Sequence, residues 1–202
     1  MSVTKRTVGI LMFDGVEVLD FAGPFEVFSR ARLVPGTDSR RSDESAPFSV
    51  CLISADGGPV SATGNLRVMV DFSLSTAPHL DIFIVPGGFG TRPLLDDAAL
   101  VAAVAARARQ AEIAASVCTG ALLLAKGGLL EGRKATTHWG ALDLLASLGS
   151  IDVLPDRRYV EDGVLTSAGV AAGIDLSLAI VERLCGRAVA DDTARYMDYP
   201  RS

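Results

Sequence analysis

The sequence is poor in the residues that most often carry catalysis. Its 202 residues include only three Cys and two His, and aromatic residues make up 6%. Three widely separated Cys form neither a disulfide framework nor a zinc site, so we expect reduced thiols in a cytoplasmic protein and no bound metal. Asp and Glu outnumber Lys and Arg by 24 to 19, which argues against a nucleic-acid partner because phosphate backbones attract basic surfaces.

The chain also lacks long hydrophobic runs. Its longest nearly apolar stretch, residues 113–125, contains polar residues and is shorter than the roughly 20 residues that a membrane helix needs. The apolar run at 7–13 follows two basic residues, but it is too short for a signal peptide and has no small-residue cleavage site. We therefore expect a soluble protein with no membrane partner, and we interpret residues 7–13 as a buried strand.

The residues that are present, 49% of them hydrophobic, alternate between two kinds of segment. Short runs rich in β-branched residues are followed by Ala- and Leu-rich stretches of helical periodicity, which is typical of a parallel sheet covered by helices. The predicted strands are 7–13, 48–54, 81–85 and 112–117, and the predicted helices are 19–31, 100–109, 119–126, 141–148 and 174–184. Because no repeat or boundary divides the chain, we predict one α/β domain over residues 1–202.

Two segments depart from this alternation. Residues 60–70 have the pattern of a small antiparallel excursion around Gly64-Asn65. Residues 35–45 are polar and charged, which predicts a mobile surface loop. We interpret the two adjacent arginines in that loop, Arg40 and Arg41, as a solvated loop tip rather than a binding patch.

Cys118 is the Cys whose neighbours suggest a chemical role. It lies between the predicted strand ending at Val117 and the predicted helix that begins at Thr119-Gly120, as in a nucleophile elbow. A helix N-terminus stabilises negative charge and would lower the pKa of a thiol placed there. The alternative is a small residue tolerated at a tight joint. Cys51, inside a predicted strand, and Cys185, at a predicted helix end, fit packing roles.

A glycine-rich loop follows the predicted strand 81–85. Its residues, Pro86-Gly87-Gly88-Phe89-Gly90, would lie at the same sheet edge as Cys118. Glycines there would let backbone N–H groups of Gly87 and Gly88 approach a substrate and form an anion hole. The loop lacks the spacing of a nucleotide-phosphate motif, so the alternative is a plain turn.

Two carboxylates could exchange protons with this thiol. Asp20 follows the first strand among apolar neighbours, and burial would raise its pKa and help it hold or transfer a proton. Its alternative role is a helix cap. Glu17 is the competing carboxylate, almost one turn earlier and beside the loop.

Neither His has an unambiguous role. His138, twenty residues after Cys118, could be the base of a Cys/His pair, or it could start the helix that follows. His79 follows Pro78 just before a predicted strand and is expected at the surface.

These segments together resemble the ThiJ/PfpI superfamily, which has the class I glutamine amidotransferase-like fold. The resemblance runs from Val8 to about Leu184 and keeps the order of the family's segments. Within the superfamily, several segments are similar to the isonitrile hydratase branch. They are Leu19-Asp20-Phe21-Ala22-Gly23-Pro24-Phe25-Glu26-Val27-Phe28, Ser116-Val117-Cys118-Thr119-Gly120-Ala121, Ala135-Thr136-Thr137-His138-Trp139 and Thr166-Ser167-Ala168-Gly169-Val170-Ala171-Ala172-Gly173-Ile174-Asp175. The resemblance implies a flavodoxin-like, three-layer sandwich around a mainly parallel sheet.

The resemblance also implies roles for single residues. Cys118 would be the nucleophile and Asp20 its carboxyl partner. Thr119 would contribute its hydroxyl or N–H beside the thiolate, and Gly88 an N–H of the anion hole. His138 would lie near the site and close to a homodimer interface in a supporting role. Thr119 stands where the protease-like branch often has His, which argues against peptidase activity.

The implied reaction converts a small molecule without cofactor or metal: cysteine-dependent hydration of isonitriles to N-substituted formamides. Two rivals are a ligand-sensing or redox-responsive protein and a related carbonyl-repair or amidase enzyme. Some regulators of this branch carry a helix-turn-helix segment after such a domain, whereas this sequence ends soon after Leu184. The charged loop at 35–46 and the tail at 195–202 depart from the hydratase pattern.

Overall fold

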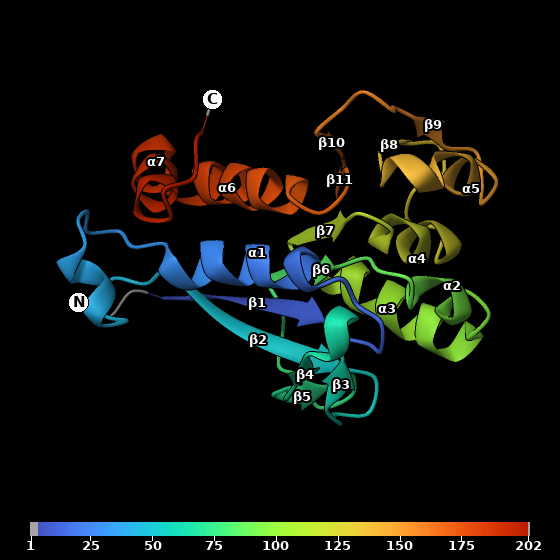
Figure 1. Cartoon of the computed structure of the whole chain (residues 1–202), viewed down its shortest axis with the longest axis horizontal. Helices are drawn as coiled ribbons and strands as arrows, with labels where there is room; N and C mark the ends of the chain where they lie inside the picture. Colours follow the sequence, from blue (N-terminus) through green and yellow to red (C-terminus); the bar gives the residue numbers. More distant parts are fainter. Residues whose placement is uncertain (1–3, 202) are drawn as a thin grey trace.

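A seven-stranded sheet forms the centre of the molecule in the computed structural model, which describes residues 4–201 (Figure 1). Its strand order is β10-β11-β7-β6-β1-β2-β5, and every neighbouring pair is parallel except β10 and β11. The strands are β1 (Arg6–Leu11), β2 (Phe48–Ser54), β5 (Phe72–Ser73), β6 (Ile82–Val85), β7 (Ile113–Val117), β10 (Tyr159–Asp162) and β11 (Val164–Ser167).

Helices cover this sheet on its two faces. They are α1 (Val18–Arg30), α2 (Thr91–Leu94), α3 (Ala98–Gln110), α4 (Gly120–Lys126), α5 (Leu142–Ala146), α6 (Ala172–Cys185) and α7 (Arg187–Tyr196). Helix α6 packs against α1 and α7, whereas α3 packs against α4. Figure 1 shows the first group in the left half of the view and α2, α3 and α4 in the right half. The predicted α/β class, with its mainly parallel sheet and flavodoxin-like layers, is confirmed.

Short elements complete the described chain. Two-stranded sheets are formed by β3 (Val60–Ser61) with β4 (Arg67–Val68), and by β8 (Lys134–Ala135) with β9 (Asp152–Val153). Single 3₁₀ turns span Asp38–Arg41, Thr63–Asn65 and Trp139–Ala141. The antiparallel pairing of β3 with β4 confirms the excursion predicted around Gly64. No helix in the described range has the length and apolar character to cross a membrane.

The central strands are apolar because helices bury both of their faces. All residues of β6 and β7 are buried, which matches the continuous Ile, Val, Phe and Ala runs seen in the sequence. The predicted strands at 48–54, 81–85 and 112–117 correspond to β2, β6 and β7 within one residue at either end. The first strand ends two residues earlier than predicted, at Leu11.

The sheet brings four chain segments to one edge. Strands β1, β6, β7 and β11 run parallel in neighbouring positions, so the loops that follow them leave at the same end. The strand order reverses between β1 and β6, because the chain proceeds from β1 outward to β2 and from β6 outward to β7. Ligand sites of open α/β sheets lie at such a reversal, beyond the carboxyl ends of the strands.

The structure corrects the interpretation of the charged loop. Arg41 is solvated, as predicted, but the side chain of Arg40 is only 2% exposed and pairs with Asp192 of α7 at 2.9 Å. Arg40 also lies over the ring of Tyr196, 4.6 Å from its centroid. The prediction was wrong for Arg40 because the residues that bury it come from the other end of the chain.

The helix predicted at 141–148 and the C-terminal elements also differ from expectation. The 3₁₀ turn Trp139–Ala141 starts that helix, and α5 ends at Ala146. The hairpin of β10 and β11 was not predicted, although Asp162-Gly163 at its turn is a common hairpin signal and Gly163 has a φ of 73°. Helix α7 was not predicted either.

Candidate active site

Cys118 occupies a sharp turn between β7 and α4. Its φ is 56°, a left-handed conformation that is uncommon for residues with a β-carbon. Its N–H is shared between the carbonyl oxygens of Ser167 and Ala168, both at 3.2 Å, so the end of β11 holds the turn. A β-carbon on Gly120 would lie 1.9 Å from the Val85 oxygen, which explains why a glycine starts α4. This geometry is that of a nucleophile elbow.

The Asp20 carboxyl group lies next to the Cys118 thiol. Asp20 is in the first turn of α1 and has no solvent exposure. Its Oδ2 accepts a hydrogen bond of 3.0 Å from the Gly87 N–H, whereas its Oδ1 is buried with no regular hydrogen-bond partner in residues 4–201. The thiol interacts with this carboxyl closely enough to shift the pKa of both groups. The fold therefore brings the two predicted groups together, and their catalytic pairing stays a prediction.

Burial dominates the acid–base behaviour of this pair. It raises the pKa of Asp20 to about 7, and the nearby charge of Glu17 adds to the rise. Burial and the charge of Asp20 raise the pKa of the Cys118 thiol to about 12. Between these values the pair holds one proton. Moving that proton from sulfur to Asp20 produces a thiolate with no change in net charge.

Two backbone N–H groups, those of Thr119 and Val170, donate to the sulfur and oppose this rise. They do not reverse it. The expectation of a lowered thiol pKa at the helix N-terminus was therefore wrong for the resting pair. The reason is that burial and a neighbouring carboxylate outweigh the helix end. When Asp20 is protonated it carries no negative charge, so burial alone still raises the thiol pKa.

The glycine loop and Thr119 form one buried network. The Gly88 N–H donates to Thr119 Oγ1 at 2.9 Å, and the Thr91 hydroxyl donates to the same oxygen at 3.1 Å. A β-carbon on Gly87 would lie 2.4 Å from the Thr119 nitrogen, so only glycine permits this approach. Both loop N–H groups are thus engaged by site side chains and position Asp20 and Thr119. A direct contact of the Gly88 N–H with a substrate stays a prediction.

A cavity of about 110 Å³ opens above the thiol. Its lining residues are Glu17, Gly88, Phe89, Arg92, Cys118, Thr119, His138 and Val170. At the site Phe89, like the neighbouring Trp139, is 80% exposed. A larger hollow, of about 650 Å³, lies along α3 and is lined by no Cys or His, so we assign the chemistry to the smaller cavity.

The structure separates the two His residues. His138 lines the cavity, but its Nδ1 accepts a hydrogen bond of 3.1 Å from the Gly140 N–H and so caps the turn that follows. No hydrogen bond links His138 to Cys118 in the described chain, which favours the structural alternative for this residue. His79 is exposed, as predicted.

The other two Cys lie outside the site. Cys51 is buried in β2, and burial raises the pKa of its thiol to about 11. Cys185 ends α6 and is half-buried. Both placements agree with packing roles. Within residues 4–201, no three side chains of His, Cys, Asp or Glu come together in a way that could hold a metal ion.

Several site residues were not anticipated in these roles. Val170 has a φ of 49° and contributes an N–H to the sulfur, although a β-branched residue gives no sequence signal for that conformation. The Thr137 hydroxyl donates to the Cys118 carbonyl at 2.7 Å and fixes the elbow from a distant segment. Phe89 and Arg92 line the cavity because the glycine loop continues directly into α2.

The chain is similar to known proteins over most of its length. The chain is 36% identical over 193 residues to an isonitrile hydratase from Pseudomonas putida, covering 95% of this chain and 78% of that protein. It is 35% identical over 140 residues to the HTH-type transcriptional regulator CdhR from Pseudomonas aeruginosa, covering 69% of this chain and 41% of the regulator. The crystal structure of a ThiJ/PfpI family protein from Pseudomonas syringae superimposes with a TM-score of 0.85 at 29% identity, covering 99% of this chain and 77% of that one.

The family assignment rests on a match that spans most of the chain. The model of the DJ-1/PfpI family matches residues 6–183, from β1 nearly to the end of α6. That range contains Asp20, Cys118 and every residue of the cavity. The chain therefore belongs to the DJ-1/PfpI family.

Proposed function

We propose that this protein hydrates isonitriles to N-substituted formamides, with Cys118 as nucleophile and Asp20 as proton donor and acceptor. The observation that carries the proposal is the buried carboxyl of raised pKa next to an elbow thiol that faces a small cavity. The 36% identity to a protein named isonitrile hydratase supports the same reaction. A cavity of about 110 Å³ suits a small, unbranched reacting group such as the isonitrile carbon and nitrogen.

The reaction begins when the proton of the pair resides on Asp20. The Cys118 thiolate attacks the terminal carbon of R–N≡C, and this carbon takes the proton from Asp20. The product is a thioimidate, R–N=CH–S–Cys118, and Asp20 is left as a carboxylate. Water then adds to the thioimidate carbon. The resulting tetrahedral intermediate collapses to R–NH–CHO, and the thiolate leaves as the proton returns to Asp20.

The surrounding residues have supporting roles in this proposal. The N–H groups of Thr119 and Val170 stabilise the thiolate as nucleophile and as leaving group. Gly87 orients Asp20, and Gly88 orients the Thr119 hydroxyl. His138 shapes the cavity without exchanging a proton. The proposed reaction is a hydration without net oxidation or reduction, so it calls for no cofactor.

The test is a turnover assay with a simple aryl isonitrile, in which formamide formation is followed by its absorbance. We expect wild-type turnover and none in Cys118→Ala. Asp20→Asn keeps the shape of the side chain but not its titrating proton, so we expect a loss of at least a hundredfold, within the range known for general acid catalysis. Absence of wild-type turnover, or full activity in Cys118→Ala, would contradict the proposal.

A ligand-sensing protein is the second candidate, favoured by the 35% identity to a transcriptional regulator. A redox-responsive role is less well supported, because Cys118 is only 6% exposed and its thiol pKa is raised, whereas easily oxidised thiols are accessible thiolates. Peroxide titration with mass spectrometry, run beside isonitrile and methylglyoxal assays, separates these candidates from hydration and from carbonyl repair.

Assembly and location belong to the same proposal. We propose a cytoplasmic homodimer whose interface lies near His138. The neighbouring Trp139 supports this interface, because a side chain that is 80% exposed presents a large apolar surface for a second copy. Light scattering coupled to gel filtration is expected to give twice the mass of the 21.1 kDa chain. A mass equal to one chain would contradict the dimer.

A further inference from the structure

A fully buried Asp20 leaves the second half of the proposed reaction without a base on the solvent side. Asp20 has no exposure and is absent from the cavity lining. Water must reach the thioimidate from the cavity. A carboxylate that faces this cavity would be better placed to take a proton from that water.

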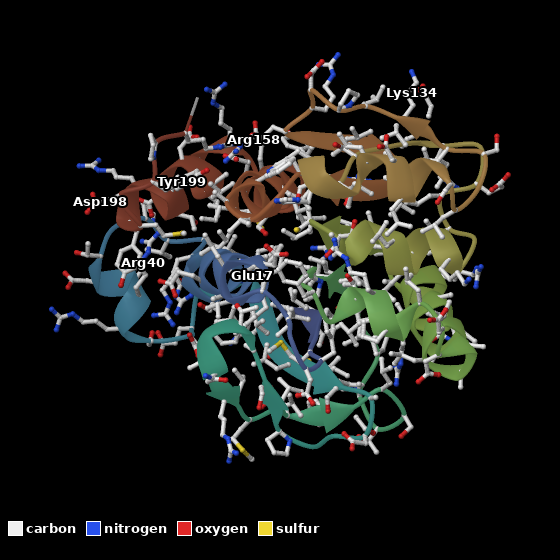
Figure 2. The ribbon with its side chains drawn as sticks, turned by 45° about the vertical axis from the view of Figure 1, so that its right-hand side comes forward. Glu17, Arg40, Lys134, Arg158, Asp198 and Tyr199 are labelled. Carbon is white, nitrogen blue, oxygen red and sulfur yellow. The ribbon has the colours of Figure 1, made fainter. Side chains whose placement is uncertain are left out.

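We propose that Glu17 is the general base that activates water for hydrolysis of the Cys118 thioimidate. This inference rests on the proposed isonitrile hydration and assigns it a second carboxylate. Glu17 is half-buried and lines the same cavity as Cys118. Figure 2 shows Glu17 near the centre of the view and Lys134 at its upper right edge.

The backbone fixes Glu17 opposite the glycine loop. Its N–H donates to the Gly87 carbonyl oxygen at 2.9 Å, and its own carbonyl accepts the Asp20 N–H at 3.2 Å. The carboxylate Oε1 accepts a hydrogen bond of 3.3 Å from the Thr63 hydroxyl, which orients the side chain. Its Oε2 has no hydrogen-bond partner in residues 4–201 and is free to accept one from water.

The two carboxyl groups have environments that suit opposite tasks. Burial favours the protonated form of Asp20, and the negative charge of Glu17 strengthens that preference. Glu17 is only half-buried and lines the cavity together with Arg92 and His138. Pairs of acids in such unlike surroundings commonly divide the work of proton donor and proton acceptor.

The division of labour balances every proton. Asp20 gives its proton to the isonitrile carbon as the C–S bond forms. Glu17 takes a proton from the attacking water as the new C–O bond forms, and the C=N electron pair moves to nitrogen. Glu17 then gives this proton to that nitrogen. The hydroxyl proton of the tetrahedral intermediate passes to Asp20 as the C=O bond forms and the C–S bond breaks, which regenerates all three groups.

The test measures the two halves of the reaction separately in Glu17→Gln. After mixing with an aryl isonitrile and quenching with acid, mass spectrometry follows the Cys118 adduct, and absorbance follows the formamide. We expect a persistent adduct and turnover reduced roughly a hundredfold or more. Adduct formation should slow far less than release, because loss of the Glu17 charge only weakens one of the effects that keep Asp20 protonated. Hydroxylamine, a nucleophile that needs no general base, is expected to release the adduct at similar rates from variant and wild type.

Two further variants control this experiment. Glu26→Gln removes an exposed carboxylate from α1, the helix that begins directly after Glu17, and is expected to leave both halves unchanged. Glu17→Asp keeps the charge on a shorter side chain and is expected to restore part of the turnover. Thermal unfolding of each variant checks that the fold is retained.

The outcomes distinguish this inference from the reaction itself. Adduct release at the wild-type rate in Glu17→Gln would overturn the role of Glu17 and leave isonitrile hydration intact. Adduct formation and release slowed by the same factor would also overturn it, because Glu17 would then act before water attack. Absence of both formamide turnover and a Cys118 adduct, in the wild-type protein and in Glu17→Gln alike, would overturn the hydration proposal.

Discussion

At the scale of single residues, two energetic costs meet at Cys118. Its φ of 56° is unfavourable for a side chain with a β-carbon, and its thiol is buried against the Asp20 carboxyl. Backbone strain and buried titratable groups both reduce folding stability, and both are concentrated at functional sites. Each cost can be measured separately by a substitution that removes it.

The strained backbone at Cys118 predicts that glycine is more stable than alanine at this position, the reverse of the usual order. Cys118→Gly should be more stable than Cys118→Ala by about 1 kcal/mol, because glycine adopts a left-handed φ without a β-carbon clash. Urea unfolding measures the difference. At Cys51, in the extended strand β2, the order should reverse, because glycine weakens a strand interior. An alanine variant at 118 as stable as the glycine variant would argue against strain.

The raised pKa of Asp20 predicts how stability depends on pH. Its folded value, about 7, lies above its unfolded value near 3.8, so the protonated carboxyl favours folding. That contribution is complete below pH 4 and is lost as pH rises through 7, by up to about 4 kcal/mol. Asp20→Asn lacks the titration, so its stability advantage over wild type should grow from pH 5 to pH 8. The urea midpoints of the two proteins are compared at both pH values. A difference between them that is the same at pH 5 and at pH 8 would contradict this prediction.

At the scale of elements, the site depends on how closely the start of α4 approaches the end of β6. Across this contact, a β-carbon on Gly87 would lie 2.4 Å from the Thr119 nitrogen, and one on Gly120 would lie 1.9 Å from the Val85 oxygen. Gly88 instead packs against the loop after β1, where its β-carbon would lie 2.3 Å from the Gly15 oxygen. The approach of α4 to β6 lets the Gly88 N–H reach Thr119 and keeps Asp20 beside the sulfur. The two loops therefore form one rigid support for the thiol.

Gly120→Ala should damage that support. Its β-carbon would overlap the Val85 oxygen, so α4 must shift, at a cost of about 1–3 kcal/mol and with loss of isonitrile turnover. Gly58→Ala is the matched control, because its β-carbon would meet only the flexible Asp56 side chain, 3.2 Å away. Urea unfolding and the turnover assay measure the two effects. A Gly120→Ala protein with wild-type stability and turnover would show that the contact is dispensable.

At the scale of the whole molecule, ion pairs join the C-terminal segment to earlier parts of the chain. Arg40 connects the 3₁₀ turn Asp38–Arg41 to α7 through Asp192. Asp175 of α6 accepts hydrogen bonds from Arg158, which precedes β10, and from Tyr199. Figure 2 shows Arg158 and Tyr199 close together near the top of the view and Arg40 at the left.

Arg40→Met should loosen the C-terminal helix. The change keeps much of the apolar stem, but it removes the guanidinium that pairs with Asp192, so we expect a loss of about 1–3 kcal/mol. Hydrogen exchange should accelerate in α7. Arg41→Met alters the neighbouring side chain, which is 84% exposed, and should change stability by less than about 0.5 kcal/mol. Equal effects of the two substitutions would contradict the buried pair.

Local patterns were sufficient to predict much of the central sheet. The apolar runs at β2, β6 and β7 were predicted within one residue, because buried parallel strands need continuous apolar sequence. The hairpin of β10 and β11 was not predicted, and the first strand was predicted two residues too long. The limits of these elements depend on pairing with distant residues. Arg40 was misjudged for the same reason.

The sequence by itself determined the order of the strands and helices and the strand–Cys–glycine–helix joint at 118. It also supplied Asp20 and Glu17 within one helical turn, because each of these features depends on near neighbours in the chain. Only the tertiary structure decided that Asp20 lies next to the thiol, that Glu17 lines the cavity and that the Gly88 N–H donates to Thr119. It also decided the direction of the thiol pKa. Burial and electrostatic coupling are set by segments that meet only when the sheet closes.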